Sequence, residues 1–155
     1  MGHSGSATNI RYGFVQHLNE TTFDQAIERV TVSLKNEGFG VLTEIDVRAT
    51  LNKKLGIDFR RYVILGACNP ALAHRALEAE PQIGLLLPCN VVVQEAANGV
   101  VIISIADPRA MFALVDNANM DPVAEEADTR LRRVFNAIAG TQASLQTNTQ
   151  PKEKR

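Results

Sequence analysis

The sequence predicts an α+β fold in which a mainly antiparallel sheet is packed by helices that lie mostly on one face. Strand-like and helix-like segments follow one another in the order β-α-β-(α)-β-α-β-β-α-α. Asn98-Gly99 lies between two strong strand segments and is the best hairpin signal in the chain. Only Val91–Val93 and Val100–Ile103 resemble the continuous apolar runs of a parallel sheet covered on both faces.

The first third of the chain predicts strand, helix and strand. Ile10–Leu18 mixes β-forming and polar residues and is the first predicted strand. Thr22 as N-cap and Gln25 three residues later form a capping box for the next helix, which Gly38 ends. Val41–Val47 alternates apolar and polar side chains, so we expect a half-buried second strand.

The middle of the chain predicts a short helix, a strand and a longer helix. Arg48–Leu55 is the short helical stretch. Arg61–Cys68 is rich in β-branched and aromatic residues, which favours a strand. Asn69 is a predicted N-cap and Pro70 the first helical residue, because proline suits that position. Pro81 ends this helix.

The last part predicts a hairpin followed by two helices. Cys89–Glu95 and Val100–Ala106 are the strands of the hairpin. Asp107 is the predicted N-cap of a short helix and Asp121 that of the last helix, which we expect to stop at Gly140. The predicted organisation is one α+β domain over residues 8–140 and a disordered polar tail over 141–155.

The composition excludes several classes of protein. A chain of 155 residues can bury enough surface to fold without disulfides or metal. Its net charge of −1 provides no basic field for nucleic acid, and no segment is apolar and long enough to span a membrane. The first six residues lack the apolar core of a signal peptide. We therefore expect a cytoplasmic protein with reduced thiols, bound to neither nucleic acid nor membrane.

Two cysteines occupy related settings, Ala-Cys68-Asn69-Pro and Pro-Cys89-Asn90. Cys68 ends a predicted strand beside a helix N-terminus, where the helix dipole stabilises a thiolate. If the two strands are antiparallel neighbours, both thiols lie at one edge of the sheet; a parallel crossover would separate them by roughly 20 Å. The alternatives are a two-thiol site and two inert, buried thiols.

Four polar residues complete the candidate site. Asn69 is explained as a helix cap, whereas Asn90 on a strand is a candidate for a polar network near the cysteines. Glu44 and Asp46 share one face of the second strand and would suit acid–base chemistry if one pKa were raised. Alternatively, these carboxylates form a solvated strand face, and Asp46 caps the short helix that follows.

Three segments of this chain resemble a known family. They are GFGVLTEID (38–46), LGACNP (65–70) and GLLLPCNV (84–91), and the likeness extends over about residues 10–139. In that order they resemble the domain-of-unknown-function family numbered 302, whose members are bacterial and archaeal single-domain proteins. The resemblance implies a curved antiparallel sheet gripped by helices, similar to the TATA-binding-protein-like fold, and association as a homodimer. It implies no activity or cofactor.

Three functions are compatible with these residues. The first is a binding or sensing module that holds a small ligand, a metal or a haem beside Cys68, Asn69, Cys89 and Asn90. The second is a thiol-dependent redox enzyme that uses Cys68, although no histidine is evidently placed as its base. The third is a homodimeric interaction domain in which the cysteines are structural. Catalysis and cofactor remain unassigned by the sequence.

Overall fold

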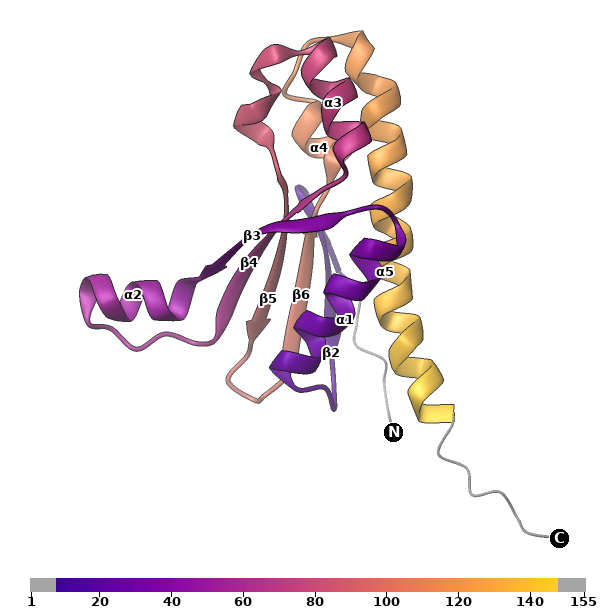
Figure 1. The fold of residues 1–155 in the computed structure, drawn as a ribbon. Coiled ribbons are helices and arrows are strands. Elements are labelled where there is room, and N and C mark those ends of the chain that lie inside the picture. The colour runs from indigo at the N-terminus through magenta and orange to yellow at the C-terminus, as the bar shows by residue number, and fades with distance from the viewer. Residues whose placement is uncertain (1–7, 148–155) are drawn as a thin grey trace, which may run out of the picture.

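The computed structural model describes residues 8–147 and contains a six-stranded sheet of order β1-β2-β6-β5-β4-β3 (Figure 1). Every strand pair in it is antiparallel, which confirms the predicted α+β class and antiparallel sheet. The strands are β1 Thr8–Ile10, β2 Gly13–Leu18, β3 Gly40–Asp46, β4 Tyr62–Cys68, β5 Cys89–Glu95 and β6 Val101–Ala106.

Helices cover one face of this sheet. Figure 1 shows α1 and α5 side by side against it, with α3 and α4 gathered beyond the end of the strands. The α-helices are α1 Phe23–Asn36, α2 Val47–Leu55, α3 Pro70–Ala79, α4 Pro108–Phe112 and α5 Asp121–Thr147, and the 3₁₀ segments are η1 Pro81–Leu86 and η2 Ala118–Met120. Among the described residues, no helix has the length and apolar character needed to cross a membrane.

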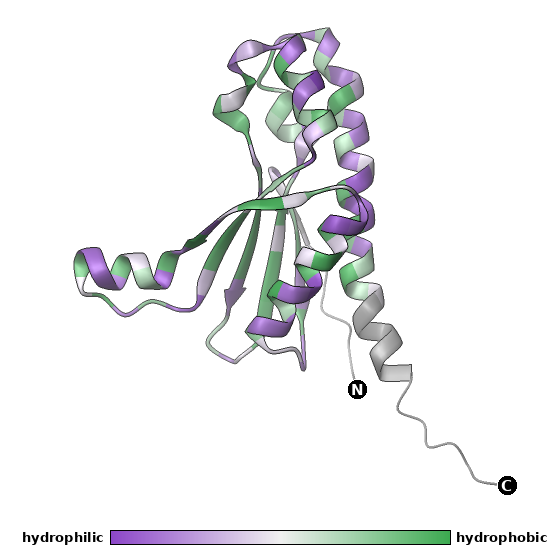
Figure 2. Cartoon of the chain, in the orientation of Figure 1, coloured by the Kyte–Doolittle hydropathy of each residue, from purple (hydrophilic) through white to green (hydrophobic). Residues whose placement is uncertain are grey.

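The core lies between the sheet and the two long helices. Leu65, Val93 and Ile103 on the strands meet Leu34 of α1 and Leu131 of α5, and each of these side chains is almost completely buried. Figure 2 shows the apolar residues of the central strands against helices whose outer surfaces are polar. Burial of apolar area on this scale is the main stabilising contribution to such a fold.

Local signals in the sequence fix several boundaries as predicted. The Thr22 hydroxyl accepts from the Gln25 amide and the Gln25 side chain accepts from the Thr22 amide, so the capping box is present. Gly38 follows α1 with a φ of 83°, which is the left-handed conformation that favours glycine. Gly99 in the β5–β6 turn has a φ of 81° for the same reason.

The predicted first strand is wrong in its details. It is interrupted by a turn at Arg11–Tyr12, which divides it into β1 and β2 and makes a hairpin. Arg-Tyr is not a typical turn pair, so the sequence carried no warning. Gly13 after the turn lies against β6, where a Cβ atom would stand 2.9 Å from the Ile105 carbonyl oxygen.

The boundaries predicted for α5 are also wrong. Asp121 is not an N-cap, because its backbone is already helical and continues η2, whose own N-cap is Asn117. Gly140 does not end the helix, which runs on to Thr147. A single glycine inside a helix costs only about 1 kcal/mol. The turn of α5 before Gly140 is anchored in the core by buried side chains such as Ile138, so this cost is not enough to end the helix. Residues 148–155 of the expected tail lie outside the described residues.

The predicted burial of the second strand is wrong as well. β3 is the edge strand of the sheet, and none of its residues is buried. The helix that follows it, α2, also has no buried residue. Figure 1 shows β3 and α2 projecting from the rest of the fold as an arm.

Candidate functional site

Cys68 and Cys89 lie on neighbouring antiparallel strands at the same rim of the sheet. Cys68 is the last residue of β4 and Cys89 the first of β5. The register pairs Cys89 with Ala67, the residue before Cys68, so the two cysteines are offset by one position at the ends of neighbouring strands. Of the two arrangements open to the sequence, the structure has the antiparallel one, which places both cysteines at the same rim of the sheet.

Both cysteines line one small cavity at this rim. Its other walls are mainly apolar and come from six parts of the fold, with Phe39, Leu72, Pro88 and Phe112 among the lining residues. The cavity volume is about 30 Å³, the space of a single water molecule in the liquid. It has room for one small ion, whereas cavities for drug-sized ligands measure roughly 300 Å³ or more. A haem does not fit it.

The apolar walls change the acidity of Cys89. The residue as a whole is partly exposed, but removal of water from around its thiol raises the pKa from the ordinary 9.0 to about 11. A smaller contribution comes from the charge of Cys68, which opposes a second negative charge nearby. Cys89 therefore keeps its proton at neutral pH, and the pair resists carrying two charges unless a cation compensates them.

Cys89 also borders a second cavity of about 110 Å³. Leu87, Pro88, Cys89 and Phe112 line both spaces and separate them. Met111, at the end of α4, lines the second cavity. Cys89 is therefore one of the residues that form the wall common to the two cavities.

Asn69 acts as the predicted N-cap and ties the cysteine rim to the helices. Its side-chain oxygen accepts from the Leu72 amide, and its side-chain nitrogen donates to the Glu37 carbonyl, 3.5 Å away. Gly38 makes this approach possible, because a Cβ atom there would stand 2.9 Å from the Asn69 side-chain nitrogen. The GFG and CNP segments are therefore in contact in space.

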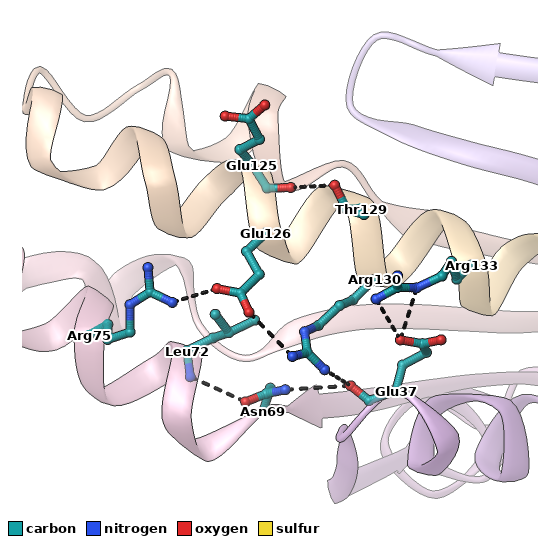
Figure 3. A network of polar contacts seen from close by, with 9 residues as sticks. All are labelled: Glu37, Asn69, Leu72, Arg75, Glu125, Glu126, Thr129, Arg130 and Arg133. Carbon is teal, nitrogen blue, oxygen red and sulfur yellow. Dashed lines mark hydrogen bonds and ion pairs between the residues drawn. The ribbon is translucent and has the colours of Figure 1, made fainter.

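A network of charged side chains surrounds this contact (Figure 3). Arg130 of α5 donates to the Glu37 carbonyl at 3.1 Å and to the Glu126 carboxylate at 3.2 Å. Glu126 also accepts from Arg75 of α3, and Arg133 pairs with the Glu37 carboxylate. Hydrogen bonds from Arg75 and then Arg130 hold the pKa of Glu126 below its ordinary value. The network joins the C-terminal end of α1 with α3 and α5 next to Asn69.

The remaining predicted site residues lie apart from the small cavity. Asn90 is exposed and lines the second cavity instead. Glu44 and Asp46 are exposed on β3, and Asp46 caps α2 by accepting from the Ala49 amide at 2.9 Å. That is the capping role that the sequence offered as an alternative to acid–base chemistry.

Residues from distant segments complete the site and could not be identified from the sequence. Phe112 follows α3 by more than thirty positions, and Val123 lies on α5, yet both line the small cavity. Nothing in the sequence around either residue indicates that its side chain reaches the cysteines. Within residues 8–147, no group of three or more His, Cys, Asp or Glu side chains is arranged to hold a metal ion.

A larger cavity lies elsewhere, over α4, η2 and the start of α5. It measures about 580 Å³, is open to solvent, and is lined by Arg109 and by acidic residues that include Asp116 and Glu125. Neither cysteine borders it. We assign the candidate site to the small cavity, because that is where the chemically distinctive side chains converge.

Comparisons with known proteins agree with this fold. The family model described as "Domain of unknown function DUF302" matches residues 14–138. A crystal structure of an uncharacterised conserved DUF302 protein from Bacillus stearothermophilus is similar, with a TM-score of 0.75 and 32% sequence identity. The alignment covers 82% of this chain and 98% of that one. No curated protein matches the chain. On this evidence the chain belongs to the DUF302 family.

Proposed function

We propose that this protein is a binding module for a soft, singly charged metal ion, of which Cu⁺ is the biological example, held between Cys68 and Cys89. The observation that carries the proposal is that both cysteines line one cavity of about 30 Å³, which has room for a single ion. Thiolates are the preferred ligands of Cu⁺ among protein side chains. Two thiolates in a line are a sufficient coordination shell for this ion.

The electrostatics support the same ligand. Burial and the charge of Cys68 raise the pKa of Cys89, so the metal-free pair keeps at least one proton at neutral pH. Binding of Cu⁺ replaces both thiol protons and leaves a complex of net charge −1, in place of the doubly charged thiolate pair that the apolar walls disfavour. Binding should therefore release protons and tighten as pH rises.

Other metals suit the site less well. Zinc takes four ligands in structural sites and three protein ligands in catalytic ones. In the part of the chain that the structure describes, only the two cysteines converge, with no third ligand of the usual kinds. We therefore expect the site to bind Cu⁺ in preference to Zn²⁺, because it offers two ligands and Zn²⁺ needs three or four.

The test is an anaerobic titration of the reduced protein with Cu⁺ in competition with a chromophoric chelator. We expect one ion per chain, an ultraviolet thiolate-to-copper absorption, and loss of both in the Cys68→Ser, Cys89→Ser double variant. His74→Ala is the control, because His74 is exposed on α3 and forms an ion pair with Glu78 of the same helix, at 3.5 Å. Binding that survives in the double variant, or that needs His74, would refute the proposal.

A thiol redox role is the second candidate, and the presence of both cysteines on the wall of one cavity supports it. Its chemistry would be oxidation of two thiols to one disulfide, with two electrons passed to a disulfide or peroxide oxidant. Titration of the protein with oxidised glutathione, read by mass spectrometry, distinguishes the two functions. A reversible loss of two hydrogens together with no binding of Cu⁺ would favour the redox role.

A further inference from the structure

A second sulfur-bearing residue lines the cavity of about 110 Å³ that adjoins the candidate site, called the second cavity from here on. Met111 of α4 lines it together with Cys89 of β5, whereas Cys68 does not. Its volume is more than three times the roughly 30 Å³ of the small cavity, so it has room for an ion and for the end of one further side chain. Cys89 is therefore shared by a cavity that contains a second thiol and a cavity that contains a thioether.

The two sulfur groups are the only soft ligands among the described residues that line the second cavity. Asn90 contributes an amide, and the other lining residues are leucines, prolines, an alanine and a phenylalanine. Thiolates and thioethers select Cu⁺, whereas carbonyl oxygens suit harder ions such as Mg²⁺ and Ca²⁺. The lining of the second cavity therefore favours the same ion that we propose for the Cys68–Cys89 pair.

The charge of the second cavity also suits a Cu⁺ ion held by one cysteine. None of its described lining residues carries a formal charge. A Cu⁺ ion bound by one thiolate and one neutral thioether forms a complex of zero net charge, whereas two thiolates leave a charge of −1. Because uncompensated charge is costly beside apolar groups, the second cavity can accept the ion, although a thioether attracts it less strongly than a thiolate does.

The fold holds Met111 in place and leaves the second cavity accessible. The Met111 amide donates to the Asp107 carbonyl at 3.0 Å in the first turn of α4, and its side chain packs partly buried against the core. Leu85 is 84% exposed and Asn90 is also exposed, yet both line the second cavity. The second cavity therefore reaches the surface beside these two residues, where a ligand from outside can approach Met111 and Cys89.

We propose that the second cavity is a transfer position, in which Cys89 and Met111 hold the Cu⁺ ion while it passes between the Cys68–Cys89 pair and a thiol from outside. This inference rests on the proposed function, since it concerns how the ion of that site is exchanged. Cys89 lines both cavities and is a ligand in both positions, so the ion moves without being released to water.

The transfer is an exchange of ligands and needs no electron donor or acceptor. On the way out, the bond from copper to the Cys68 sulfur breaks, the bond to the Met111 sulfur forms, and the Cys68 thiolate takes a proton from water. The external thiol then gives up its proton and binds copper as a thiolate. The bonds to Met111 and Cys89 break, and the Cys89 thiolate takes a proton. Copper remains Cu⁺ throughout, and entry is the same sequence in reverse.

The first test uses the Cys68→Ser variant, which lacks the proposed two-thiol site but keeps the transfer position. Methionine methyl groups are labelled with ¹³C, and Cu⁺ is added without oxygen in competition with a chromophoric chelator. We expect one ion per chain, bound more weakly than by the wild type, and a shift of the Met111 methyl signal. Adding Met111→Leu, which removes the sulfur at similar volume, should abolish this binding. Met120→Leu is the matched control, because Met120 is 1% exposed and lines neither cavity.

The second test follows the loss of copper from the loaded protein to glutathione, with Cys68 and Cys89 intact. We expect Met111→Leu to slow this loss while one ion still binds, and Met120→Leu to match the wild type. If the wild type binds one ion but Met111→Leu releases it at the wild-type rate, the transfer position is refuted and the proposed function stands. If the wild type binds no Cu⁺, both are refuted. Should circular dichroism show that Met111→Leu is unfolded, the Met111 methyl signal of Cys68→Ser decides, and an unshifted signal overturns the inference.

Discussion

Gly38 and Asn69 are in contact although thirty residues separate them in the chain. Gly38 has a φ of 83°, and a Cβ atom on it would stand 2.9 Å from the Asn69 side-chain nitrogen. Asn69 in turn caps α3 and directly follows Cys68. The glycine therefore does more than end α1, because it also sets the position of the residue next to the candidate site.

Substitution of Gly38 by alanine should destabilise the protein for two reasons. The left-handed conformation is strained for alanine by about 1–2 kcal/mol, and the Cβ atom would displace Asn69. We expect the free energy of unfolding, measured in urea, to fall by about 2 kcal/mol or more. Gly40→Ala is the matched control, since open space surrounds that position, and a loss of equal size there would contradict the explanation.

The sequence was informative where a feature depends on neighbouring residues. The Thr22–Gln25 capping box, the Asn69-Pro70 helix start and the Asn98-Gly99 turn are all present as predicted. Each of these depends on contacts within a few residues, so the chemistry is visible in the sequence itself. The antiparallel sheet followed from the pattern of apolar runs and is confirmed.

The features that the sequence hid depend on distant contacts. β3 alternates like a half-buried strand, but its place at the edge leaves it exposed. Gly140 resembles a helix stop, but α5 continues through it to Thr147. Cys68 and Cys89 were recognised as candidates, whereas their common cavity depends on strand register and on Phe112, which arrives from α4.

Arg130 should contribute more to stability than its exposed neighbour Arg133. Its guanidinium donates to the Glu37 carbonyl at the end of α1 and to the Glu126 carboxylate at once. Lysine cannot reproduce this two-sided contact, so we expect Arg130→Lys to lower the free energy of unfolding by about 1–2 kcal/mol. Arg133→Lys, at an exposed ion pair, should cost less than about 1 kcal/mol. If thermal or urea unfolding showed equal losses of stability in Arg130→Lys and Arg133→Lys, this role for Arg130 would be contradicted.

The stability of the protein should fall in alkali because of Cys89. Its pKa is 9.0 in an ordinary environment and about 11 in the fold, so below pH 9 the thiol is protonated whether or not the chain is folded. Between pH 9 and 11 the thiol ionises in the unfolded chain but not in the folded one. The free energy of unfolding therefore falls by up to about 2–3 kcal/mol over this range. The Cys89→Ala variant has no thiol to titrate, so its free energy of unfolding should depend less steeply on pH in that range. If the free energy of unfolding fell equally steeply with pH in the wild type and in Cys89→Ala, the raised pKa would be contradicted.

Removal of the Phe112 ring should open Cys89 to solvent reagents. This side chain is 6% exposed and lines both the small cavity and the neighbouring one of about 110 Å³, so Phe112→Ala would join them. We expect a loss of about 3–5 kcal/mol in stability, as for other buried aromatic truncations, and faster alkylation of Cys89 measured by peptide mass spectrometry. Ile138→Ala is the control, because it removes a fully buried side chain of α5 that lines neither cavity. If alkylation of Cys89 rises equally in both variants when compared at equal stability, global unfolding and not the local partition controls access to the thiol.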